Sequence, residues 1–349
     1  MTLRGPVAHR RNNFDFLRIV AAFCVLISHQ HALTGQPEPS VLGAQSLGGF
    51  GVLVFFAISG FLVSQSWQQD PCLWRFAARR LLRIWPGFAV VILLVSVVLG
   101  PLVSTLPPRD YYQHPGFVDY FFNLLFRLRD GLPVNFTGSA IPHASNGSLW
   151  SIPLELACYV ALAGAGVLGL LRRPWALPMA ALLSAAVYFF AQPYWLALTQ
   201  RAGLGQEFLL LAMFGNFFLA GAAASSLALH QRPHVQQQAI ALSCVLLGLA
   251  AYLADQPLLA IWCVLPVMVT LFGNMQTPLI RHAGHFGDLS FGVYIYAFPV
   301  QQTLIWLYKD RLSWLTLLAA CVAVTLGLAW LSWHAVEKWA LQLKPQRPA

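Results

Sequence analysis

Long apolar runs, separated by short polar or turn-forming segments, dominate the hydropathy pattern of this chain. A helix needs about 20 mainly apolar residues to cross the ~30 Å hydrocarbon core of a bilayer, and ten runs approach that length. They cover residues 14–34, 47–66, 84–104, 149–171, 175–191, 207–229, 239–254, 257–275, 286–307 and 314–334. The pattern predicts an all-α, polytopic membrane helix bundle of about ten transmembrane helices, forming one domain over residues 1–349.

One long polar segment interrupts this pattern, at residues 105–148, and it is rich in turn formers such as PPRD and GLPVNFTGSAIPHASNGS. Within it, VDYFFNLLFRL (118–128) is too short and too charged for a span, so we expect it at the membrane interface or as a re-entrant segment. The short tails at residues 1–13 and 336–349 are basic. With no soluble terminal domain expected, any activity must lie in the bundle or at its two faces.

Composition and charge agree with a membrane protein. The 349 residues are 58% hydrophobic and 9% charged, whereas soluble domains carry about 25% charged residues. The six cysteines are scattered without C-x-x-C spacing, so we expect neither a metal site nor a disulfide framework.

The distribution of the +9 net charge predicts the topology. With the N-terminus inside, fifteen Lys and Arg residues fall in cytoplasmic segments and six in outer ones, which satisfies the positive-inside rule. Both termini are then cytoplasmic and residues 105–148 form an outer loop. The excess of Arg over Lys is typical of a G+C-rich bacterial genome, so we expect a multi-pass protein of the bacterial cytoplasmic (inner) membrane. The basic charge is a topology signal and gives no reason to expect nucleic-acid binding.

The first predicted helix carries ionisable groups along one face. Arg18 and His29 are eleven residues apart, which places them on the same face about 16 Å apart along the axis. Asp15 lies one turn before Arg18 and can pair with it. Either Arg18 reaches the interface and His29 is an ordinary interfacial residue, or the polar face marks a functional path, as intramembrane ionisable residues often do.

Four short motifs then follow one another along the chain. They are R-x10-H at residues 18–29, F-F-x-x-S-G at 55–60, R-x-x-R at 80–83 and W-S-x-x-x-E at 150–155. In this order, on a ten-helix layout, they resemble the membrane-bound acyltransferase-3 family, whose members O-acylate cell-surface glycans and other exported molecules. The resemblance covers essentially the whole chain. It departs where many relatives read Y-L-x-H, because this chain has Ala297 in place of that histidine.

The resemblance implies transfer of an acyl group, expected to be acetyl, from cytoplasmic acyl-CoA to a hydroxyl of a surface glycan or lipid-linked sugar. An alcohol needs a general base at neutral pH, and His29 is the candidate; it could instead carry the acyl group covalently. Glu155, at a similar predicted depth, is expected to orient or charge His29, or else to form a structural ion pair.

Arg80 and Arg83 lie one helical turn apart where a basic loop enters the third helix. Guanidinium groups bind phosphates well, so these residues and Arg18 are candidates for holding acyl-CoA, although positive-inside topology alone also places arginines there. The pantetheine arm could then lie along the polar face toward His29. No permanently bound cofactor is expected.

Further polar and small side chains are candidates for the substrate pocket. They are Asp15, Ser59, Gly60, Trp150, Ser151 and Tyr294. Gly60 permits either close helix packing or room for a ligand, and Trp150 is either an interfacial anchor or a sugar-stacking residue. Asp288, Ser290 and Tyr296 cluster near Tyr294 without an assigned role.

Two other functions fit the same layout. The bundle could transport or flip a glycan precursor, although the matched broken helices common in transporters are not evident. An enzyme of the same family could use a succinyl donor or act on a small secreted metabolite. The expected partners are acyl-CoA, a glycan or lipid-linked sugar, membrane lipids and, if the chain does not complete the transfer alone, a separate acyl-accepting protein.

Overall fold

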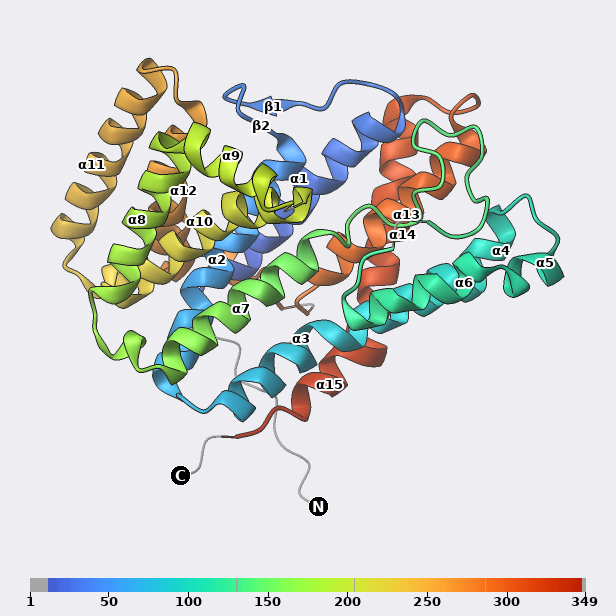
Figure 1. Cartoon of the computed structure of the whole chain (residues 1–349). Coiled ribbons are helices and arrows are strands. Elements are labelled where there is room, and N and C mark those ends of the chain that lie inside the picture. The colour runs from blue at the N-terminus through green and yellow to red at the C-terminus, as the bar shows by residue number, and fades with distance from the viewer. Residues whose placement is uncertain (1–11, 130, 204, 286, 347–349) are drawn as a thin grey trace.

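The chain is almost entirely helical, as predicted. The computed structural model describes residues 12–346 apart from residues 130, 204 and 286 (Figure 1). The predicted basic positions Arg4, Arg10, Arg11 and Arg347 lie outside the described residues. In the described part, the named strands are β1 (Ser40–Val41) and β2 (Gln45–Ser46), which form one short antiparallel hairpin.

Every predicted apolar run contains a helix. The helices that carry these runs are α1 (Phe14–Leu33), α2 (Leu47–Gln69), α3 (Leu73–Leu93), α7 (Ser151–Val167), α8 (Ala176–Phe190), α10 (Gln206–Ser226), α11 (His234–Leu253), α12 (Pro257–Asn274), α13 (Ser290–Tyr308) and α14 (Trp314–Ser332). The shorter helices are α4 (Gly100–Val103), α5 (Pro108–Gln113), α6 (Pro115–Tyr120), α9 (Gln192–Arg201) and α15 (Lys338–Gln342).

Seven helical segments in the described residues are long and apolar enough to cross a membrane, by length and composition. They begin at Phe14, Leu47, Leu73, Gln206, His234, Pro257 and Trp314. Helices α8 and α9 together meet the same criteria but are bent by 87° at their junction, and α7 is a shorter apolar helix. The chain therefore has the helices of a multi-pass membrane protein, while a total of ten spans stays a prediction.

The third helix begins earlier than predicted. We expected a span from residue 84 preceded by a basic loop, but α3 starts at Leu73 and continues through a π-helical segment (Leu94–Leu99) into α4. Residues 73–83 form an amphipathic stretch whose Phe76 is buried, and its charged face lowers the local hydropathy below that of a span. Arg80 and Arg83 are consequently fixed on a helix, not on a flexible loop.

Helix α2 lies at the centre of the bundle, between α1 and α10 (Figure 1). Gly60 and Gly221 allow the α2–α10 contact, since a Cβ at either position would overlap a backbone carbonyl of the other helix. The largest core cluster joins α2, α3, α7, α10 and α13. Helix α11 lies at the edge of the molecule with very little of its surface buried, as expected for a lipid-facing helix.

The predicted outer loop folds onto the far end of α13. Asn146 donates a hydrogen bond to the Ile295 carbonyl (2.8 Å), and Gln302 donates to the carbonyl of Ile141 (2.7 Å). Segment 118–128 forms the end of α6 and a short 3₁₀ helix beside α3. This loop therefore covers one end of the bundle, and α1 ends beneath it.

Candidate active site

A pocket between α1, α2, α3, α7 and α13 gathers most of the predicted site residues. The space between its lining atoms, counted together with the part open to solvent, amounts to about 750 Å³. Seven of the eleven predicted residues line it: Arg18, Ser59, Arg80, Arg83, Ser151, Glu155 and Tyr294. Residues far apart in sequence thus converge on one cavity, because α2 and α13 bring their polar positions to face α3 and α7.

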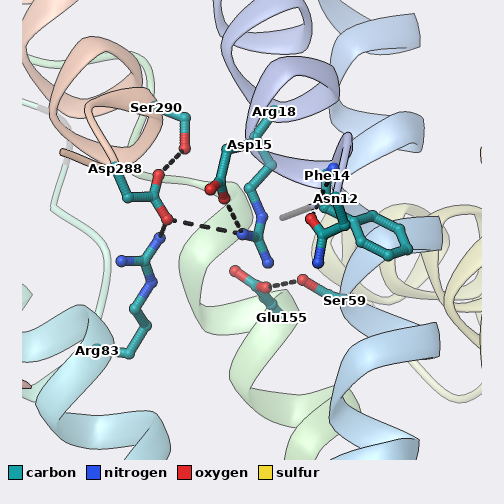
Figure 2. Close-up of polar contacts among 9 residues, drawn as sticks. All are labelled: Asn12, Phe14, Asp15, Arg18, Ser59, Arg83, Glu155, Asp288 and Ser290. Atoms are coloured by element: carbon teal, nitrogen blue, oxygen red, sulfur yellow. Dashed lines mark hydrogen bonds and ion pairs between the residues drawn. The ribbon is translucent and has the colours of Figure 1, made fainter. Parts of the chain in front are cut away.

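Two of the arginines share one carboxylate at the end of the pocket nearest the start of α1. Arg83 bonds to Asp288, and Arg18 lies 3.6 Å from the same Oδ2 and 3.3 Å from Asp15 (Figure 2). Ser290 donates to the other oxygen of Asp288 (2.6 Å). Burial opposes ionisation of Asp288, but the two guanidinium groups outweigh it and hold its pKa well below the usual range. Asp288 therefore fixes both arginines at this end of the pocket.

Arg80 differs from its neighbours in having no such carboxylate. Among the described residues the buried Nε of Arg80 has no hydrogen-bond partner, and the same holds for Nε and Nη2 of Arg79. Arg79 and Arg75 differ from Arg80 in that each also bonds to Asp70, at 2.7 and 2.6 Å. Those bonds hold the pKa of Asp70 well below its usual range. Arg75 and Arg79 thus share the single charge of Asp70 and are not among the residues that line the pocket, whereas Arg80 lines it.

The carboxylate of Glu155 faces the middle of the pocket. It accepts hydrogen bonds from Ser59 (2.5 Å) and from the Tyr159 hydroxyl. Ser59 lies on α2 and Tyr159 one turn after Glu155 on α7, so the acid is held from two helices that enclose the pocket. The structure therefore brings Glu155 to Ser59 and Tyr159, and it does not bring Glu155 to His29 as we expected.

The Ser151 and Tyr294 hydroxyls meet at the other end of the pocket. Their oxygens are 2.6 Å apart, and the Tyr294 ring packs edge-on against Phe55 with centroids 5.6 Å apart. Both residues were predicted as pocket lining, and the pair joins α7 to α13. This contact closes the pocket toward the outer loop.

His29 lies beyond this closure and does not line the pocket. Its ring packs edge-on against Phe298, one helical turn past Tyr294 on α13, with centroids 5.1 Å apart. Within the described chain, its buried Nδ1 has no hydrogen-bond partner. Phe298 also packs tightly over Gly147 of the outer loop. One turn of α13 and the Phe298 ring therefore separate His29 from the arginine-containing pocket.

The remaining predicted residues take up packing positions. Gly60 faces α10, where a Cβ would lie 1.9 Å from the Phe218 carbonyl oxygen, so it provides close packing and not ligand space. The Trp150 ring packs against Phe214 with centroids 5.2 Å apart. Asp15 acts through its ion pair with Arg18.

Two charged residues near the site were not among the predicted ones. Lys344, just after α15, lies close to Arg83 and Arg80; burial and these cations lower its pKa to about 7. Glu38, in the loop after α1, accepts a hydrogen bond from Ser28, the residue before His29. Neither belongs to a motif, and only the folded chain brings them to these positions.

Comparison with known proteins gives a consistent assignment. The family model described as "Acyltransferase domain" matches residues 11–334. An O-acetyl transferase of Shigella phage Sf6 is 30% identical over 345 residues, covering 95% of this chain and 96% of that protein. Nodulation protein 10 of Rhizobium leguminosarum bv. viciae is 26% identical over 378 residues, covering 96% and 94% of the two chains. No solved structure matches this chain.

Proposed function

Because the chain belongs to the acyltransferase domain family, which its sequence matches almost throughout, we propose that it is an integral-membrane O-acetyltransferase. It moves an acetyl group from cytoplasmic acetyl-CoA to a hydroxyl of a surface glycan or lipid-linked sugar. The observation that carries the proposal is one pocket with arginines at one end and hydroxyl groups at the other, with His29 packed against Phe298, one helical turn beyond Tyr294. The name of the phage relative favours acetyl as the group transferred.

The basic end of the pocket suits the phosphates of the donor. Arg18 and Arg83 are held by Asp288, and Arg80 retains a buried donor without a partner. Three partly buried guanidinium groups at one end of a pocket favour an anion that can accept several hydrogen bonds. We assign this end to the cytoplasmic side, since Lys344 and the start of α1 lie there together, in keeping with the positive-inside prediction.

The opposite end suits the acceptor. His29 lies under the outer loop, and the donor's extended pantetheine arm would run past Glu155 and the Ser151–Tyr294 pair to reach it. That passage requires the Ser151 and Tyr294 hydroxyls to part and Phe298 to move, because the two hydroxyls now meet at the end of the pocket and the Phe298 ring packs against His29.

The transfer balances with His29 as the proton carrier. The imidazole takes the proton from the acceptor hydroxyl, the hydroxyl oxygen bonds to the thioester carbonyl carbon, and the C–S bond breaks. The imidazolium then gives its proton to the departing CoA thiolate. The products are an acetyl ester and free CoA, and His29 returns to its starting state.

Labelled acetyl-CoA tests this proposal directly. Membranes containing the protein would be incubated with acetyl-labelled acetyl-CoA and the host's surface glycan, and both glycan-bound label and free CoA would be measured. We expect equal amounts of base-labile label and free CoA, and loss of both in His29→Ala. A transporter would release no CoA, and free CoA without labelled glycan would refute the proposed acceptor.

A further inference from the structure

Glu38, which belongs to none of the sequence motifs, has a carboxylate that bonds to Ser28, the residue before His29 on α1. The loop that carries it folds back over the end of α1: Gln36 N–H donates to the His31 carbonyl (2.9 Å), and Leu47 N–H donates to the Pro39 carbonyl (2.7 Å). Glu38 both follows and precedes a proline, which restricts the backbone on each side of it. The side chain is therefore presented from a constrained loop, although the residue itself is exposed.

Ser28 anchors this carboxylate next to the histidine. The Ser28 hydroxyl is fully buried and donates to Oε2 of Glu38. Gly48 at the start of α2 lies against Ser28, where a Cβ would come within 2.9 Å of the serine Cβ. Ser28 is thus confined between α2 and the loop, one residue before His29 on α1.

The other groups around His29 do not supply a charge. Phe298 on α13 faces the ring with its aromatic edge, and Glu155 is bonded to Ser59 and Tyr159. Within the described residues, the Ser28 hydroxyl ties the carboxylate of Glu38 to the position next to His29 on α1.

We propose that Glu38, held by Ser28, is the positioning residue that stabilises the His29 imidazolium formed during acyl transfer. This inference rests on the proposed function, and it reassigns to Glu38 the role that we expected of Glu155. When His29 takes the hydroxyl proton its ring becomes positive, and a fixed negative charge nearby lowers the energy of that state. Since Glu38 is exposed, its effect is that of a partly screened charge and not that of a buried triad acid.

The first test measures His29 without requiring turnover. Diethyl pyrocarbonate modifies neutral imidazole, so the pH dependence of His29 modification, followed by peptide mass spectrometry, reports its titration. We expect Glu38→Gln to move the midpoint by about half a pH unit toward lower pH, the shift of one screened charge. Glu207→Gln, an exposed carboxylate at the start of α10, should leave the midpoint in place.

The second test measures activity in the same variants. Glu38→Gln should reduce kcat about three- to fivefold at neutral pH with little change in the KM for acetyl-CoA, and move the acidic limb of the pH–rate profile with the midpoint. Glu38→Asp should restore part of the loss, and Ser28→Ala should give a smaller one. An unshifted midpoint in an active enzyme would overturn the role of Glu38. A shifted midpoint in a protein that transfers no acetyl would instead refute the proposed function.

Discussion

Replacing Gly60 by alanine tests whether the F-F-x-x-S-G motif holds the bundle together or makes room for a ligand. A Cβ at residue 60 would lie 1.9 Å from the Phe218 carbonyl oxygen and 2.7 Å from its carbonyl carbon. Ordinary contact begins near 3.4 Å, so α2 and α10 would have to separate by about 1.5 Å. The obstacle is helix backbone, which cannot rotate away as a side chain can.

The expected cost follows from this geometry. Overpacking a well-packed core typically costs about 1–3 kcal/mol, and a backbone clash places Gly60→Ala near the upper value. A loss of ~3 kcal/mol would lower the melting temperature by roughly 4 °C in a protein of 349 residues. Because Gly221 makes the reciprocal contact with Ala57, with 2.1 Å between its added Cβ and that carbonyl oxygen, Gly221→Ala should behave in the same way.

The assay is thermal unfolding of the detergent-purified protein, followed by tryptophan fluorescence and by size-exclusion recovery after heating. Gly215→Ala is the matched control on α10, since no atom lies within 4 Å of its added Cβ; it should be neutral or slightly stabilising. If Gly60→Ala melted like Gly215→Ala but raised the KM for the donor, the packing explanation would be wrong and the glycine would serve the ligand.

Three further predictions concern the charged end of the pocket. Arg80→Gln should raise the KM for acetyl-CoA about tenfold or more, because a charge-assisted phosphate contact is worth roughly 1.5–3 kcal/mol. The control Arg79→Gln removes a partner of Asp70 and should mainly lower the melting temperature. Equal KM values in the two variants would contradict the assignment of Arg80 to the donor site. The pKa of Lys344 is lowered to about 7, so Lys344 is positively charged below pH 7 and neutral above it. The affinity for acetyl-CoA should therefore fall as the pH rises through 7, by at most tenfold per pH unit. Equilibrium binding should show this slope flattened in Lys344→Gln, and a slope unchanged in that variant would exclude Lys344 from the donor site. Asp288→Asn leaves two guanidinium groups without their shared carboxylate and should cost about 3 kcal/mol of unfolding free energy. Because the pKa of Asp288 is depressed, this contribution is present at neutral pH and lost only in strong acid, so wild type and variant should have similar stability in strong acid by chemical denaturation. Equal stability of the two proteins at pH 7 would refute this role of Asp288.

The helical architecture could be predicted well from the sequence because a membrane helix requires a long run of apolar residues. Each of the ten apolar runs contains a helix. The start of α3 could not be predicted in this way, since the charged face of residues 73–83 hides an amphipathic helix from a hydropathy average. The count of spans also does not follow from apolar runs alone, because the 87° bend between α8 and α9 is a feature of the folded chain.

The site was predictable where motifs and helical geometry coincide. Arg18, Ser59, Glu155 and Tyr294 were chosen from patterns on separate helices, and the fold brings all four to one pocket. What could not be predicted is which of these groups touch. Spacing places residues along one helix, but the partner of a carboxylate depends on how the helices are rotated and on loops such as the one carrying Glu38.

The measurement that tests the central claim most directly is the NMR signal of base-labile acetyl groups on the host's surface glycan. Wild type, a deletion strain, and the deletion complemented with His29→Ala at equal expression would be compared. We predict that the acetyl signal is present in wild type, absent from the deletion strain and still absent when the deletion is complemented with His29→Ala. Acetyl that persists in the deletion would contradict the proposed acetyl transfer to this glycan, and acetyl restored by His29→Ala would contradict the role given to His29.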